Sequence, residues 1–217
     1  MVQQFRCNVI DGSNVARRVA NILIVLTAVY IGACTERVSV SVETFPLPNP
    51  VVEKLHLTVG VHYTEDFRSY RRTIDRDVWI YDLSLGSGSV DLFDQVLRSI
   101  FVSVISVSKV QFPSDHQPSP MLILEPSLYA NVEGGRGVLA GYPKYTLNYG
   151  LKFYDANGTK LGSWTVSGHV SDIQTAMRHA AAKLLLGLPE QEYVHAALVR
   201  TEGRVDVENT AGQDDSR

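Results

Sequence analysis

The stretch from 144 to 170, KYTLNYGLKFYDANGTKLGSWTVSGHV, decides the fold of this 217-residue chain. Apolar and polar residues alternate on both sides of Asn157-Gly158, a dipeptide typical of a two-residue type I′ turn. Such a turn places Leu151 opposite Trp164, and it makes one face of the paired strands apolar and the other polar. The sequence therefore predicts an antiparallel hairpin with one buried face.

Four further strands are predicted before this hairpin, at 54–63, 78–85, 104–112 and 121–132, the last interrupted at Pro126. Apolar residues at helical spacing predict a helix over 89–103, with Ser89 as its N-cap and Asp91 in its first turn. The segment from 64 to 76 is interpreted as a polar, aromatic and basic connection between strands.

Two helices are predicted after the hairpin. Ser171 and Gln174 have the spacing of a capping box, and Ile173, Met177, Ala180 and Leu184 follow as the buried stripe of a helix that ends near Gly187. A shorter amphipathic helix is expected over 190–200. This order of elements predicts an α+β fold, a mainly antiparallel sheet with two or three helices packed on one face, in a single domain.

Composition excludes several classes of protein. A hydrophobic content of 45% is enough for a packed core and excludes a disordered chain. A net charge of −3 argues against nucleic-acid binding by general electrostatics. Two cysteines exclude both a disulfide framework and a cysteine-rich zinc site.

The N-terminal region carries the most specific motif. Arg17 and Arg18 precede an apolar run over 19–30, which ends in Ile31-Gly32-Ala33-Cys34. This tetrapeptide resembles the lipobox of bacterial lipoprotein signal peptides. The resemblance implies cleavage between Ala33 and Cys34 and a diacylglycerol and N-acyl modification of Cys34. The alternatives are an uncleaved anchor or a buried helix with a chance cysteine, but the run is short for a membrane span.

The expected organisation follows from that motif: a signal peptide over 1–33, a lipidated tether over 34–53, a periplasmic domain over 54–200 and a disordered tail over 201–217. Initiation at Val15, which an alternative start codon can encode, would shorten the leader. The prolines of 45–50 favour an extended tether, although valines alternating with serines over 38–42 also allow a strand. Thr35 after the cysteine resembles enterobacterial signals for release to the outer membrane, with the domain facing the periplasm.

Sequence motifs for catalysis or metal binding are weak. The six histidines lack metal-ligand spacing, and the GxGxxA string over 135–140 is followed by Pro143, which ends any helix. We expect no enzymatic activity, and no metal or cofactor beyond the acyl groups of Cys34.

One segment has the composition of a binding site. Aromatic and arginine side chains, which are enriched at protein interfaces, gather within 63–72, and the candidate partner-binding residues are Phe67, Arg68, Tyr70, Arg71 and Arg72. The alternative is that Phe67 and Tyr70 pack on the core.

With a lipobox and a compact α+β domain, the chain resembles small Gram-negative envelope lipoproteins, among them the lipoprotein partner of the lipopolysaccharide translocon and lipoproteins with curli-secretion-like domains. That resemblance implies a non-enzymatic accessory protein that docks on a protein partner in an envelope assembly or transport system. The alternative is a periplasmic lipoprotein that binds a lipid, a glycan or a small ligand. A hydrolase ranks third, and no nucleic-acid partner is expected.

Overall fold

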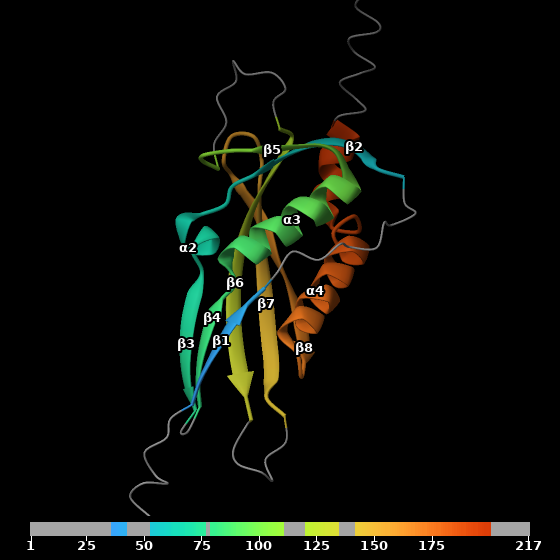
Figure 1. Ribbon diagram of the computed structural model, residues 1–217. Helices are drawn as coiled ribbons and strands as arrows, with labels where there is room; N and C mark the ends of the chain where they lie inside the picture. The colour runs from blue at the N-terminus through green and yellow to red at the C-terminus, as the bar shows by residue number, and fades with distance from the viewer. Residues whose placement is uncertain (1–35, 43–52, 77–78, 111–119, 135–141, 201–217) are drawn as a thin grey trace, which may run out of the picture. The chain divides into compact units, whose positions relative to one another are not determined.

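The strands form two sheets, with the orders β5-β2-β6-β7-β8 and β1-β4-β3 (Figure 1). The structure, a computed structural model, describes residues 36–42, 53–76, 79–110, 120–134 and 142–200. The strands are β1 (Glu36–Ser41), β2 (Leu55–Val61), β3 (Arg71–Arg76), β4 (Trp79–Ser84), β5 (Phe101–Ser106), β6 (Leu122–Glu133), β7 (Lys144–Tyr154) and β8 (Lys160–Val170). The helices are α2 (Glu65–Arg68), α3 (Gly86–Ile100) and α4 (Ile173–Gly187), and residues 192–200 are also helical.

The predicted α+β class is confirmed, but the larger sheet is mixed rather than mainly antiparallel. Strand β7 pairs antiparallel with β6 and β8, whereas β2 runs parallel to both β5 and β6. Parallel strands need a long crossover, and here α2, β3, β4 and α3 lie between β2 and β5 along the chain. Alternation of side chains does not reveal strand direction, so the sequence could not predict this pairing.

One face of the larger sheet is buried under α3 and α4 (Figure 1). From β7 it buries every second residue, which are Tyr145, Leu147, Tyr149, Leu151 and Phe153. The predicted stripe of α4, formed by Ile173, Met177, Ala180 and Leu184, is buried as expected. Within the described residues, no helix is long and apolar enough to cross a membrane.

The β7–β8 hairpin has the predicted register but a different turn. Leu151 lies opposite Trp164, yet the turn is closed by a hydrogen bond from the Gly158 N–H to the Asp155 carbonyl oxygen at 3.0 Å. Gly158 is the residue that follows this turn, and its φ is +83°. A bulge near Tyr154 then restores the register. Three-residue connections commonly combine a turn and a bulge in this way, and the Asp155 carboxylate supports it by accepting from the Thr159 N–H.

Pro126 does not interrupt β6, contrary to the prediction. The N–H of Ala130 and the carbonyl of Leu124 point away from β7, so by alternation the missing N–H of Pro126 would also lie on that side. Pairing with β2 ends at Leu124. Proline is tolerated at such an edge because it removes no ladder hydrogen bond.

Both predicted helix caps are wrong, that of α3 by four residues and that of α4 by one. Helix α3 starts at Gly86 and ends at Ile100, so Ser89 lies inside the helix and is fully buried, and Asp91 lies beyond the first turn. Helix α4 is capped by Asp172 rather than Ser171, since its carboxylate accepts from the Thr175 N–H at 2.8 Å.

The second sheet was not predicted, because two of its strands lie in segments interpreted as connections. Residues 64–76 form α2 and β3, and the strand alternative for 38–42 is the one observed, as β1. Strand β3 buries only Ile74, and β1 buries none of its side chains fully, so neither has a strong apolar pattern. The rest of the predicted tether, 43–52, and the tail over 201–217 lie outside the described residues.

Candidate functional site

Phe67 belongs to the hydrophobic core and is 2% exposed. Its ring stacks on Tyr63 with centroids 5.7 Å apart and meets the edge of Phe93 at 5.6 Å. Helix α2 places it there: Thr64 caps the helix by accepting from the Phe67 N–H. A partner could not contact this side chain while the domain is folded.

Arg68, Tyr70 and Arg72 make contacts within the domain. The Arg68 Nε donates to the Tyr63 carbonyl oxygen at 3.1 Å, and the Tyr70 hydroxyl accepts from the Ala130 N–H at 2.9 Å. The Arg72 guanidinium lies 4.3 Å from the centroid of the Tyr129 ring and donates to its hydroxyl. Arg68 therefore fixes α2 to the residue after β2, whereas Tyr70 and Arg72 hold β3 and the residue before it against β6.

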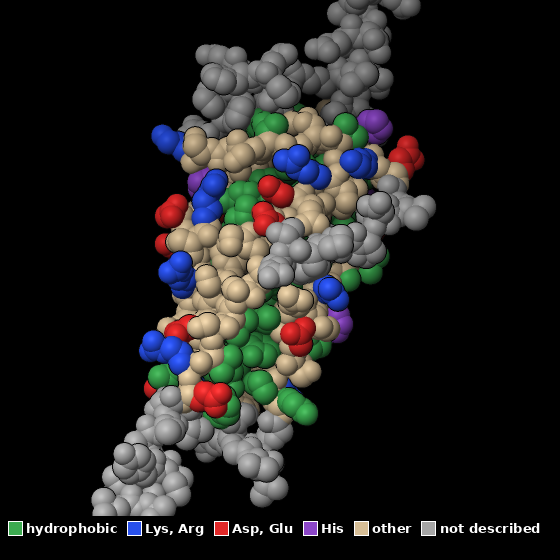
Figure 2. Space-filling view, viewed as in Figure 1, with side chains coloured by type: hydrophobic (Ala, Val, Ile, Leu, Met, Phe, Trp, Pro, Cys, Tyr) green, Lys and Arg blue, Asp and Glu red, His purple; other side chains and the backbone are tan. Residues whose placement is uncertain are grey.

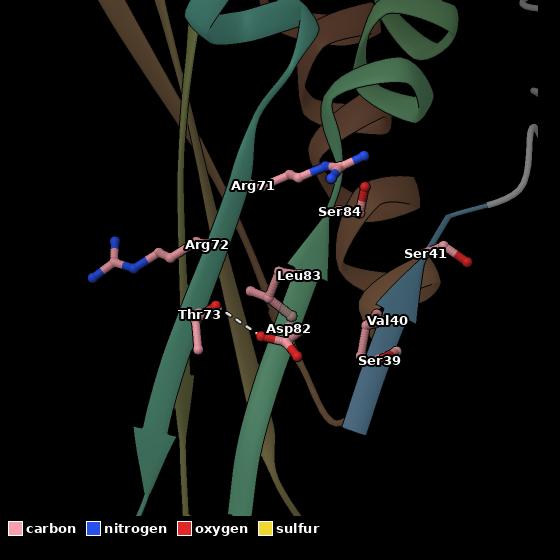
Figure 3. Close-up of a pocket in the computed structure, with 9 residues that line it drawn as sticks. All are labelled: Ser39, Val40, Ser41, Arg71, Arg72, Thr73, Asp82, Leu83 and Ser84. Carbon is pink, nitrogen blue, oxygen red and sulfur yellow. Dashed lines mark hydrogen bonds between the residues drawn. The ribbon is translucent and has the colours of Figure 1, made fainter. Parts of the chain in front are cut away.

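Arg71 differs from the other four candidates because its side chain is exposed and forms no hydrogen bond or ion pair with the described residues. It lines a pocket of about 440 Å³ on the outer face of the small sheet, which we call the Arg71 pocket. Figure 3 shows Arg71 extending over Ser84, whereas Arg72 points the opposite way. The pocket is lined by Ser39, Val40, Ser41, Arg71, Arg72, Thr73, Asp82, Leu83 and Ser84.

The single carboxylate of the pocket is already partnered. Asp82 Oδ1 accepts from the Thr73 hydroxyl at 2.7 Å, and Asp82 Oδ2 lies 3.3 Å from the Arg37 Nε. Arg37 therefore pairs with Asp82, and no described carboxylate pairs with the Arg71 guanidinium beside the serine hydroxyls. This arrangement can bind an anion.

The edges of the larger sheet differ in how they are closed. Pairing of β6 with β2 ends at Leu124, and side chains cover the edge of β6 beyond that residue, which we call its lower edge. There the Tyr70 hydroxyl accepts from the Ala130 N–H, and the Arg76 Nε donates to the Val132 carbonyl oxygen at 2.9 Å. Strand β8 lies against α4, whose Lys183 Nζ donates to the Ser167 carbonyl oxygen. Part of each edge is thus already occupied by side chains of the domain.

Strand β5 is the other edge, and within the described part of the chain no strand pairs with its outer side, so we call this edge open. The Val107 N–H donates to the Val61 carbonyl oxygen, so by alternation the N–H and C=O groups of Val102, Val104 and Ser106 point away from β2. Among the described residues these groups have no partner. The Val102 side chain is 54% exposed, and no charged residue or proline occurs in the strand. Natural edge strands usually carry such protection.

The uncovered face of the larger sheet is polar and self-paired. Lys152 Nζ lies 2.7 Å from Glu125 Oε1, directly across the strands, and the Ser167 hydroxyl donates to Asn148 Oδ1 at 2.6 Å. On the opposite, helix-covered side, Figure 2 shows acidic and basic side chains interspersed around a band of hydrophobic ones. Neither face therefore offers a single-sign surface for a polyanion.

The histidines had no metal-ligand spacing in the sequence, and one of them, His62, makes a contact within the domain. The His62 Nδ1 lies 3.2 Å from the Val107 carbonyl oxygen, which is a structural contact. Within the described ranges, no three His, Cys, Asp or Glu side chains are grouped to hold a metal ion. The lipidation site Cys34, the cleavage residue Ala33 and the glycine-rich stretch over 135–141 lie outside the described residues.

Comparison with known proteins identifies no family. No family model matches the chain, and no curated protein matches it. Similar solved structures include protein XCC0632 from Xanthomonas campestris, assigned to DUF330, with a TM-score of 0.37, 13% identity and coverage of 79% of this chain and 98% of that one. The hypothetical protein CT253 from Chlamydia trachomatis has a TM-score of 0.30 and 11% identity, covering 68% of this chain and 96% of its own. Likeness at this level supports no functional conclusion.

Proposed function

We propose that the chain is an outer-membrane-anchored lipoprotein that faces the periplasm and acts as a non-enzymatic docking component of an envelope assembly or transport system. The anchor is supported by the motif Ile31-Gly32-Ala33-Cys34. Acyl chains contribute about 0.8 kcal/mol per buried CH₂, so several chains together hold a protein on a bilayer. The docking role is supported by one structural observation, the open edge of β5.

The chemistry of that edge selects an extended strand as the partner. Alternating donors and acceptors along Val102, Val104 and Ser106 are best satisfied by another backbone running alongside at about 4.8 Å. The neighbouring side chains, exposed on Val102 and half-buried on Val104 and Ile105, favour aliphatic residues in that strand.

Charges at the two ends of β5 favour acidic flanks in the partner. Arg98 lies three residues before the strand and Lys109 three residues after it, and the residues between them are uncharged. Opposite charges at the rim of an interface speed association and fix register. The proposed partner therefore carries an extended apolar segment bounded by acidic residues.

In-cell photo-crosslinking tests this docking role. A photoreactive residue replaces Val102 in the acylated protein, and a matched one replaces Thr165, on the polar face of β8. We expect one envelope protein to crosslink from position 102 and not from position 165, and to be lost in the Cys34→Ser form. If position 102 captures nothing, or captures only a second copy of the chain, docking of a partner strand is excluded.

The variant Val102→Pro provides an independent check. It removes one outward N–H while leaving the hydrogen bonds between β5 and β2 in place. We expect the melting temperature to change little and the crosslinked partner to be lost. Retention of the partner would mean that it does not pair along β5.

Ligand binding is the second candidate function, and the Arg71 pocket favours it. Its volume of about 440 Å³ falls within the usual size of small-molecule sites, about 300–1,000 Å³. A thermal-shift screen of the purified protein with lipids and glycans separates the two functions. Stabilisation by a ligand, with no protein partner in cells, would favour a binding lipoprotein over a docking one.

A further inference from the structure

Strand β1 starts very close to the proposed lipid anchor. Glu36 is its first residue and Arg37, the next, belongs to the same compact unit as the rest of the domain. Three residues separate Cys34 from Arg37, and an extended chain covers at most about 3.6 Å per residue. If Cys34 is acylated, Arg37 lies within about 11 Å of the acylated residue along the chain.

Arg71 is also close to β1, because both belong to the small sheet. Its order is β1-β4-β3, and neighbouring strands lie about 4.8 Å apart, so Arg71 on β3 is two strand spacings from β1. Arg37 and Asp82 form their ion pair between β1 and β4, on the same outer face as Thr73 and Arg71. The pocket therefore lies on the sheet whose first strand, β1, directly follows the proposed anchor along the chain.

The pocket offers donors suited to a phosphate. A guanidinium forms paired, charge-assisted hydrogen bonds with phosphate oxygens, and hydroxyl groups add further donors. Here the Arg71 guanidinium has no competing partner among the described side chains, and the hydroxyls of Ser39, Ser41 and Ser84 share the lining. Asp82 does not oppose the anion strongly, because Arg37 balances it.

We propose that the Arg71 pocket binds the phosphate of a phospholipid head group in the membrane that holds the anchor. The proposal rests on the proposed acylation of Cys34, which brings the pocket within reach of the bilayer surface. Bound in this way, the small sheet fixes the orientation of the domain on the membrane, and β5, in the other sheet, remains free to pair with a partner.

Arginine footprinting on membranes tests this site. The acylated full-length mature protein is reconstituted in vesicles of phosphatidylglycerol or of digalactosyldiacylglycerol, which lacks phosphate. Phenylglyoxal modification of each arginine is then followed by mass spectrometry, and inorganic phosphate is added to the phosphate-free vesicles in a third arm. Arg200, exposed on the C-terminal helix, is the internal control.

The expected result is slower modification of Arg71 in phosphatidylglycerol vesicles by about ten-fold, the protection given by a ligand at about ten times its Kd. Arg200 should react at one rate in all arms. The variant Ser84→Ala should weaken the protection without changing the melting temperature. Equal protection by inorganic phosphate would assign the pocket to free phosphate and overturn the membrane assignment.

The same samples separate this proposal from the proposed function. The intact mass reports whether Cys34 is acylated. An acylated protein whose Arg71 reacts equally in both vesicles overturns the phosphate site and leaves the anchor standing. A protein without acyl groups overturns the anchor and, with it, the head-group site.

Discussion

The hydroxyl groups of Ser89 and Tyr149 lie 3.0 Å apart inside the core, and neither side chain is exposed to solvent. Ser89 belongs to α3 and Tyr149 to β7, so this hydrogen bond joins the helix layer to the sheet. Each hydroxyl is the other's hydrogen-bond partner, which is how a buried polar pair becomes tolerable.

Removing either hydroxyl should destabilise the domain. Ser89→Ala leaves the Tyr149 hydroxyl buried without this partner, and we expect a loss of about 1–3 kcal/mol in the free energy of unfolding, measured by urea denaturation. Tyr149→Phe should cost a similar amount. The double variant should cost less than the two single losses together, and strict additivity would mean that the two groups do not interact.

Alkaline pH should also weaken the fold through Tyr149. Burial raises the pKa of this tyrosine above its ordinary value, so the folded state holds the proton when the unfolded state has released it. The contribution of Tyr149 to stability is therefore fully present below about pH 10 and is lost as the pH rises further. Unfolding midpoints measured from pH 8 to 11 should fall less steeply for Tyr149→Phe than for the wild type.

The cap of α4 should stabilise the domain at neutral pH and lose this effect in acid. Hydrogen bonds from Thr175 lower the pKa of Asp172, so its contribution is present above about pH 4, the ordinary range of an aspartate, and is lost as the pH falls through the lowered value. At pH 7 we expect Asp172→Ala to cost about 1 kcal/mol in urea denaturation. The difference from wild type should shrink below pH 4.

Two neighbouring substitutions serve as controls for that cap. Asp172→Asn retains an acceptor at the N-cap and should lose the acid dependence while keeping most of the stability. Ser171→Ala should have little effect, because Ser171 does not cap the helix. A larger loss for Ser171→Ala than for Asp172→Ala would restore the capping box that the sequence suggested.

Two glycines on adjacent strands should respond differently to alanine. A Cβ at Gly168 would collide with the Ala176 carbonyl oxygen of α4, whereas one at Gly150 would lie 2.7 Å from the Ser127 Oγ, the end of a side chain that can rotate. We expect Gly168→Ala to lower stability by about 1–3 kcal/mol and Gly150→Ala by much less. Equal thermal shifts for the two variants would contradict the close approach of α4 to β8.

Substitution of Phe67 and of Arg71, both candidate binding residues, should have different effects on stability. Phe67→Ala removes a buried ring and should cost about 3–5 kcal/mol in the free energy of unfolding. Arg71→Ala removes an exposed side chain without an internal partner and should leave the melting temperature nearly unchanged. Circular dichroism melts of both variants check this, and a severe loss for Arg71→Ala would show a structural role.

Local patterns predicted those parts of the fold where alternation or helical spacing decided the structure. The β7–β8 register was predicted correctly although the turn was not, because the apolar face fixes the pairing and the bulge near Tyr154 absorbs the difference. The stripe of α4 was correct because four buried positions outweigh an error in its cap. Parallel pairing of β2 depends on a crossover of some forty residues, which no local pattern encodes.

The candidate site was only partly predictable. Composition singled out the segment that contains Arg71, but it could not distinguish that residue from Phe67, because burial depends on α2 and on the distant Phe93. The serines of the Arg71 pocket come from β1 and β4, far apart in sequence. The one available signal was the alternation of valine and serine over 38–42, which indicated a strand with a hydroxyl-bearing face.

The two sheets are joined across the lower edge of β6 by hydrogen bonds from side chains, those of Tyr70 and Arg76, where a continuous sheet would have a backbone ladder. Side-chain bonds can be exchanged for water one at a time, whereas a ladder opens cooperatively. The contact between the sheets therefore depends on these bonds and on the shared apolar core, in which the Tyr81 ring of β4 meets the Tyr145 ring of β7 edge-on. If Cys34 carries the proposed anchor, a pull on it would reach β1 and its pairing with β4 before it reaches this seam, and the β6–β7–β8 core lies beyond both.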